Sequence, residues 1–320
     1  MVRPISIWGV ILALLLSSII GEVQATAAGL PGPPPSRSST EPMGVLSALW
    51  QASWRIGALF LLWGALYAPL ILLRRESFQE PENLGFRLYV ECAGAGTLLL
   101  AGWILVHFID QRPFVSLGFS AKSLGQEVLL GAALGVGKLV LTLAPLWVGG
   151  WLHPAERDNV PSWSVLPLAA LTVLCNVVTQ EVLVRGYILQ TLRTYLGTAT
   201  ALIGSSLLFS AFHYGTAKGA LLPHMNLFLS GLVYGYAYLE TGNLWAPISL
   251  HWAWNLLLGP VLGLTVSGLR PELSPLYYGW SLLHVRGPAL VTGGAFGIEG
   301  GLAATFANLA LLLALYLLDP

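Results

Sequence analysis

Charged side chains are scarce in this sequence. Lysine, arginine, aspartate and glutamate make up 9% of the 320 residues, whereas about a quarter of the residues in a soluble globular domain are charged. The 15 basic and 15 acidic side chains also cancel, which leaves no excess positive charge for a nucleic-acid partner. The composition therefore excludes a soluble globular domain and argues against nucleic-acid binding.

Cysteine is equally rare. The two cysteines, Cys92 and Cys175, lie within apolar stretches and belong to no CxxC or Cys/His motif. A disulfide framework or a structural zinc site needs several cysteines or histidines at defined spacings. We therefore expect neither, and we interpret both cysteines as small residues of the core.

Apolar residues, by contrast, are abundant. They make up 55% of the chain and form continuous runs, whereas the strands of a membrane barrel alternate apolar and polar residues. A transmembrane helix needs about 20 residues to cross roughly 30 Å of hydrocarbon. The sequence therefore predicts an all-α, polytopic membrane helix bundle with the lipid bilayer as its solvent. About eight spanning helices are expected, at residues 56–73, 88–109, 128–152, 165–192, 199–212, 225–239, 244–264 and 302–318.

The N-terminal region precedes this bundle. Arg3 is followed by an apolar stretch at residues 5–20 and by small residues suited to signal cleavage at 23–27. The length of the stretch lies near the boundary between signal peptides and spanning helices, so a cleaved signal peptide and a signal anchor both stay open. The expected organisation is a signal peptide or anchor at 1–27, a Pro/Gly/Ser-rich linker at 28–45, membrane helices at 46–116, a domain with the polar motifs at 117–264, and a loop with a C-terminal helix at 265–320.

Polar residues interrupt three of the predicted spans. Ionisable groups are costly inside a bilayer, so each is a functional candidate. Glu181 and Arg185 lie four residues apart, on one helical face and in the order that favours an ion pair. His213 ends a second apolar run, and His251 and Asn255 share a face of a third at the same spacing of four.

These side chains are sufficient for hydrolysis without a serine or cysteine nucleophile. Glu181 can take a proton from a water molecule that His213 holds. His251 and Asn255 can donate hydrogen bonds to the developing oxyanion. Each motif also has a structural interpretation, because Glu181 with Arg185 is typical of an intramembrane ion pair, and the other polar groups are typical of contacts between helices.

Metal catalysis is the alternative chemistry. One carboxylate and two histidines are enough for a three-ligand zinc site. The sequence has no HExxH motif, in which helical spacing brings two ligands and a base together. We therefore expect a site without a cofactor and keep zinc as the alternative.

The three motifs resemble those of the CAAX protease and bacteriocin-processing family, also called the abortive-infectivity family. The family patterns are EExxxR, FxxxH and HxxxN. Here they read Gln180-Glu181-x-x-x-Arg185, Phe209-x-x-x-His213 and His251-x-x-x-Asn255. The resemblance covers residues 117–264 and implies a cofactor-free intramembrane endopeptidase that cleaves a membrane-embedded or membrane-tethered peptide or protein. We expect a multi-pass protein of a bacterial plasma membrane.

One position departs from the family pattern. The first glutamate, to which the family assigns the activation of water, is Gln180, and an amide cannot act as a general base. Consecutive helical residues point about 100° apart, so Glu181 does not point where Gln180 points. Two hypotheses follow: Glu181 has taken over the activation of water, or the chain is a catalytically silent relative that binds a membrane peptide or protein.

Two further charged residues stand outside these motifs. Lys138 lies in the middle of an apolar span, and we expect it to pair with Glu91 or Glu127. Glu299 follows a glycine-rich run, and we expect it in the turn that enters the last helix, where the helix dipole favours its charge.

Overall fold

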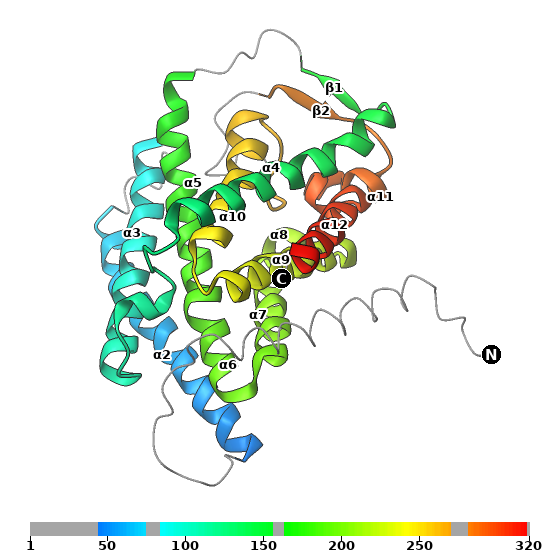
Figure 1. The fold of residues 1–320 in the computed structure, drawn as a ribbon. Coiled ribbons are helices and arrows are strands. Elements are labelled where there is room, and N and C mark those ends of the chain that lie inside the picture. Colours follow the sequence, from blue (N-terminus) through cyan, green and yellow to red (C-terminus); the bar gives the residue numbers. More distant parts are fainter. Residues whose placement is uncertain (1–43, 75–83, 156–162, 270–280, 319–320) are drawn as a thin grey trace, which may run out of the picture.

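The computed structural model describes residues 44–74, 84–155, 163–269 and 281–318 (Figure 1). Helices make up most of this part of the chain, which confirms the all-α prediction. One short antiparallel pair of strands joins β1 (Leu152–Pro154) to β2 (Leu283–Val285), with His153 opposite His284. The expected signal segment and most of the linker, up to residue 43, lie outside the described residues.

Four described helical segments are long and apolar enough to cross a membrane, and the chain is an integral membrane protein. They match the first four predicted spans and comprise Val45–Leu72, Leu84–Ile109, Leu124–Val148 and Leu166–Leu196. Two shorter apolar helices, Thr198–Phe212 and Leu302–Leu317, match the predictions at 199–212 and 302–318. The other two predicted spans are also helical, as α9 (Leu221–Thr241) and as α10 (Trp245–Leu256) with the π-helical η6 (Leu257–Val261).

The ends of two helices differ from the prediction for local reasons. Helix α2 (Val45–Leu72) begins well before residue 56, because the preceding residues are also good apolar helix formers. Helix α4 (Leu124–Val148) ends before residue 152, because Gly149 and Gly150 follow it. Gly150 has a φ of 69°, a left-handed conformation that stops a helix.

The predicted span at 165–192 is divided into three helical segments in the structure. These are α5, the π-helical segment η5 and α6. In chain order the remaining elements are α3 (Leu84–Ile104), η2 (Leu105–Ile109), η3 (Phe114–Leu117), η4 (Trp163–Val165), α5 (Leu166–Glu181), η5 (Val182–Leu189), α6 (Gln190–Leu196), α7 (Thr198–Phe212), α8 (Tyr214–Ala217), α11 (Ala289–Thr292), η8 (Gly294–Phe296), η9 (Ile298–Gly300) and α12 (Leu302–Leu318).

Helix α9 forms the centre of the bundle and is buried along most of its length. Helix α7 and helix α12 pack against it, α3 packs against α5, and α4 runs across α10 (Figure 1). Glycines allow the closest of these approaches. A methyl group at Gly131 of α4 would overlap Ser249 Oγ of α10, and one at Gly135 would lie 2.6 Å from the Leu250 carbonyl oxygen. Small residues at a spacing of four are typical of helices that pack closely in membranes.

Candidate functional site

Glu181 lies at the C-terminal end of α5 and is completely buried. Its Oε1 accepts hydrogen bonds from Arg185 Nη1 at 3.0 Å and from His251 Nδ1 at 2.7 Å. Its Oε2 is buried and has no hydrogen-bond partner among the described residues. One carboxylate oxygen therefore joins the first sequence motif to the third.

Arg185 extends this cluster towards the second motif. Its Nη2 donates to the Gly231 carbonyl of α9 at 2.9 Å, and its guanidinium lies 4.7 Å from the ring centroid of Phe209 and 5.2 Å from that of Tyr234. An arginine without solvent is stabilised by a carboxylate, a carbonyl and aromatic faces. Every one of those partners is present here.

The backbone changes at this point of the chain. Directly after Glu181 the α-helix becomes the π-helical segment η5, which contains Arg185 and is buried throughout. Segments of π-helix are rare and occur frequently at functional sites. The wider turn therefore forms where the motif's ion pair lies.

His251 and Asn255 lie one turn apart on α10, and both are buried. The His251 ring stacks on Tyr234, with centroids 4.7 Å apart and an interplanar angle of 15°. Within the described part of the chain, the Asn255 amide makes no side-chain hydrogen bond, although most buried amides do. Asn255 can therefore donate to a substrate atom.

His213 lies at the junction of α7 and α8 and is half-buried. Its Nδ1 donates to the Phe209 carbonyl oxygen at 2.8 Å, which leaves Nε2 as an acceptor when the ring is neutral. The Phe209 ring lies 4.9 Å from the His213 ring and 6.0 Å from the His251 ring. Phe209 thus separates the two histidines, and in the described structure His213 makes no hydrogen bond to Glu181.

Gln180 and Glu181 point to different helices, as their helical rotation predicts. Gln180 Nε2 donates to Asn176 Oδ1 at 2.8 Å, and Asn176 Nδ2 donates to Glu91 Oε2 of α3 at 3.0 Å. Gln180 Oε1 is buried and has no partner among the described residues. The position of the family's first glutamate therefore faces a polar chain towards α3, while Glu181 faces α9 and α10.

The predicted partners of Lys138 are wrong. Lys138 Nζ donates to Ser230 Oγ at 3.0 Å and to Tyr234 OH at 3.5 Å, and it lies 4.4 Å from the Trp254 ring centroid. Glu91 is on α3, which packs against α5, and Glu127 is about 16 Å further along the axis of α4 and binds Asn243. Lys138 therefore supports the Tyr234 ring on which His251 stacks.

Glu299 lies in the turn before α12, as expected, but its carboxylate binds residues outside that helix. Its Oε1 accepts from Trp254 Nε1 at 2.8 Å, and its Oε2 accepts from the Ser267 backbone amide. Asn226 of α9 binds the same turn by donating to the carbonyl oxygens of Glu299 and Gly301 at 2.8 and 2.9 Å. The C-terminal segment is thereby attached to α9 and α10.

Neither cysteine is a fully buried core residue. Both are half-buried, and Cys92 Sγ on α3 lies 2.7 Å from Cys175 Sγ on α5. The interpretation as small residues of the core is therefore wrong about their burial, and it missed this contact because it used only the spacing of cysteines in the sequence. As for metal ligands, the described residues contain no group of three or more His, Cys, Asp or Glu that could hold an ion.

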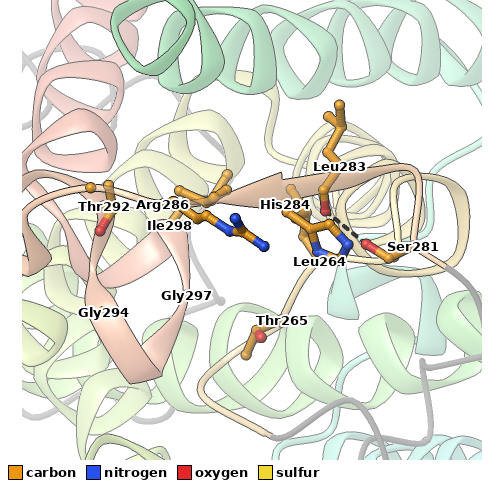
Figure 2. Close-up of a pocket in the computed structure, with 13 residues that line it drawn as sticks. Leu264, Thr265, Ser281, Leu283, His284, Arg286, Thr292, Gly294, Gly297 and Ile298 are labelled. Atoms are coloured by element: carbon orange, nitrogen blue, oxygen red, sulfur yellow. Dashed lines mark hydrogen bonds between the residues drawn. The ribbon is translucent and has the colours of Figure 1, made fainter. Parts of the chain in front are cut away.

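A cavity of about 470 Å³ is lined by none of the motif side chains. Strand β2 and the glycine-rich segment before α12 form its walls, and Figure 2 shows Arg286 and His284 directed towards it from β2 and the residue that follows the strand. No pattern in the sequence indicated this cavity. Its lining residues come from segments that are adjacent only in the folded chain.

Comparison with known proteins bears on the same helices. Residues 161–257 match the family model Rce1-like, described as type II CAAX prenyl endopeptidase Rce1-like. This part of the chain is similar to that family. The Rce1-like segment contains all three motifs and the helices from α5 to α10, which confirms the resemblance inferred from the motifs. The matched range is shorter than the range 117–264 inferred from the motifs, and it does not include α4 or α12. No curated protein and no solved structure matches the chain.

Proposed function

We propose that the chain is an intramembrane endopeptidase that hydrolyses a peptide bond of a membrane-embedded or membrane-tethered protein or peptide. The observation that supports it most directly is the contact between Glu181 and His251, which brings two of the Rce1-like motifs to one buried point. The signal-like N-terminal sequence supports a multi-pass location in a bacterial plasma membrane.

His213 is the proposed base. Because its Nδ1 donates to the Phe209 carbonyl, its Nε2 is free to hold a water molecule and take a proton from it. The water oxygen then attacks the carbonyl carbon of the substrate. When the tetrahedral intermediate collapses, His213 returns the proton to the leaving amine nitrogen.

His251 and Asn255 are proposed to bind the oxyanion through a protonated Nε2 and the side-chain amide, respectively. Glu181 acts through His251, because its carboxylate is buried and its Oε1 already accepts two hydrogen bonds.

A catalytically silent relative is the second candidate, and a specific observation favours it. Gln180 replaces the family's first glutamate, and Glu181 makes the ion pair with Arg185 that is typical of a structural role. Such a protein would bind a membrane peptide or protein through the same helices.

Proteolysis of a library of membrane-tethered peptides in liposomes tests the two candidates. Wild type is compared with His213→Ala, Glu181→Gln and Gln180→Glu, with and without a chelator, and His153→Ala on exposed β1 is the matched histidine control. Cleavage that survives the chelator and the control, but is lost in His213→Ala, supports the metal-free protease. If the chelator abolishes cleavage, the result supports the alternative hypothesis of a zinc-dependent protease. Cleavage that appears only in Gln180→Glu identifies a silent relative.

A further inference from the structure

The two cysteines meet although they are 83 positions apart in the chain. Their sulfur atoms lie 2.7 Å apart, well within van der Waals contact, and a disulfide bond of about 2.0 Å needs only a small further approach. Both side chains are half-buried on membrane-spanning helices, so a small apolar reagent that enters the bilayer or micelle can reach them.

The surrounding contacts hold the two helices together at this level. The residues next to the cysteines, Glu91 and Asn176, form a hydrogen bond of 3.0 Å between α3 and α5. Nearby, Gly94 of α3 faces Thr179 of α5, since a methyl group at Gly94 would lie 3.7 Å from Thr179 Oγ1, in ordinary van der Waals contact. Figure 1 shows α3 and α5 side by side. The helices therefore present the thiols to each other without a hinge or a loop between them.

We propose that Cys92 and Cys175 form a reversible disulfide bond that joins α3 to α5. The oxidant is a small organic disulfide, which reacts by thiol–disulfide exchange. One cysteine thiolate attacks the reagent and forms a mixed disulfide, which releases one thiol. The second cysteine then attacks the protein sulfur of the mixed disulfide, releases the second thiol and completes the Cys92–Cys175 bond, so that both electrons and both protons end on the released thiols.

The bond has a structural consequence near the motifs. Cys175 precedes Asn176, whose amide holds the Gln180 side chain. Oxidation therefore fixes this turn of α5 to α3 by a covalent bond, in addition to the Asn176–Glu91 hydrogen bond. The proposal depends on the packing of α3 and α5 and does not rest on the proposed protease activity.

Dithiodipyridine is the reagent for the test. Each exchange step with a protein thiol releases one coloured thiopyridone, so absorbance counts the exchange steps. The full chain in detergent at high dilution is treated, digested without reductant and mapped by mass spectrometry. Wild type is expected to release two thiopyridones per chain and to yield one peptide pair joined through Cys92 and Cys175. Cys92→Ser and Cys175→Ser are each expected to release one thiopyridone and retain a mixed disulfide.

A shifted cysteine is the matched control. The double variant Cys92→Ser/Ala93→Cys keeps two cysteines but turns one of them about 100° around α3, away from Cys175. It is expected to keep two mixed disulfides and to form no crosslink. Two separate mixed disulfides in wild type, or equal crosslinking in wild type and in the shifted variant, would overturn the proposal.

Discussion

His251 Nδ1 lies 2.7 Å from Glu181 Oε1, although 70 positions separate the two residues in the chain. The same oxygen accepts from Arg185, so a single buried atom holds an ion pair and a histidine in fixed positions. Because charged groups in low dielectric are stable only with their partners, the three side chains depend on one another.

Removal of the Glu181 carboxylate is expected to destabilise the fold. Glu181→Leu leaves Arg185 buried without a counter-ion, which costs about 3–5 kcal/mol of the free energy of unfolding. The double variant Glu181→Leu/Arg185→Leu is expected to recover most of this loss, because it removes both charges. Chemical denaturation in mixed micelles measures both values. If the double variant is as unstable as the single one, the ion pair is not the source of the loss.

Alanine substitutions at two buried asparagines are expected to affect different properties, cleavage activity in one case and stability in the other. Asn255→Ala should abolish cleavage with little change in thermal stability, since no side-chain hydrogen bond to the described residues is lost. Asn226→Ala should lower the free energy of unfolding by about 2–4 kcal/mol, because the Asn226 amide makes three hydrogen bonds, to two carbonyl oxygens and to Thr305. Parallel thermal unfolding and peptide-cleavage assays separate the two effects. A large loss of stability in Asn255→Ala would assign that residue to packing.

The contact of α4 with α10 predicts a contrast between two glycines of one helix. Gly131→Ala should destabilise the protein by about 1–3 kcal/mol or more, because its methyl group overlaps Ser249 Oγ and the Ala246 carbonyl oxygen. Gly137→Ala should be neutral or stabilising by up to about 1 kcal/mol, since nothing lies within 4 Å of the added carbon atom. Thermal unfolding in detergent compares the two. Equal effects would mean that α4 and α10 are further apart than described.

Restoration of the family's glutamate is expected to have a cost. In Gln180→Glu, the new carboxylate cannot donate to Asn176 Oδ1, so this hydrogen bond is lost and the Asn176 amide faces a carboxylate on both sides. We expect a loss of about 1–3 kcal/mol in the free energy of unfolding. Adding Glu91→Gln should restore it, because the glutamine supplies its own donor. Unchanged stability in the single variant would show that Gln180 does not depend on Asn176.

The sequence could predict the helices because apolar length alone identifies a spanning segment. The apolar run at 165–192 indicated one helix, and α5, η5 and α6 do follow each other without a loop. The π-helical turns at Val182–Leu189 were not predictable, since their backbone depends on burial between other helices rather than on the local pattern. The same limit applies to η6.

The sequence could also predict which side chains share a helical face, but not which faces meet. The spacing of Glu181 and Arg185 indicated their ion pair, which the structure contains. No local signal pointed to the contact of Glu181 with His251, or to Tyr234 as the ring beneath that histidine. A tyrosine within an apolar span is a weak signal, because buried tyrosines are common in cores. The partners of Lys138 were missed for the same reason.

The attachment of Trp254 and Asn226 to the turn around Glu299 has a consequence for biogenesis. Helices α9 and α10 precede that turn and α12 in the chain, so they are synthesised first. Until that turn is added, the Asn226 amide and the Trp254 indole lack the acceptors that they bind in the finished protein. Addition of the turn around Glu299 therefore provides the last acceptors for these two polar groups. A chain arrested before residue 299 leaves the Asn226 amide and the Trp254 indole without them.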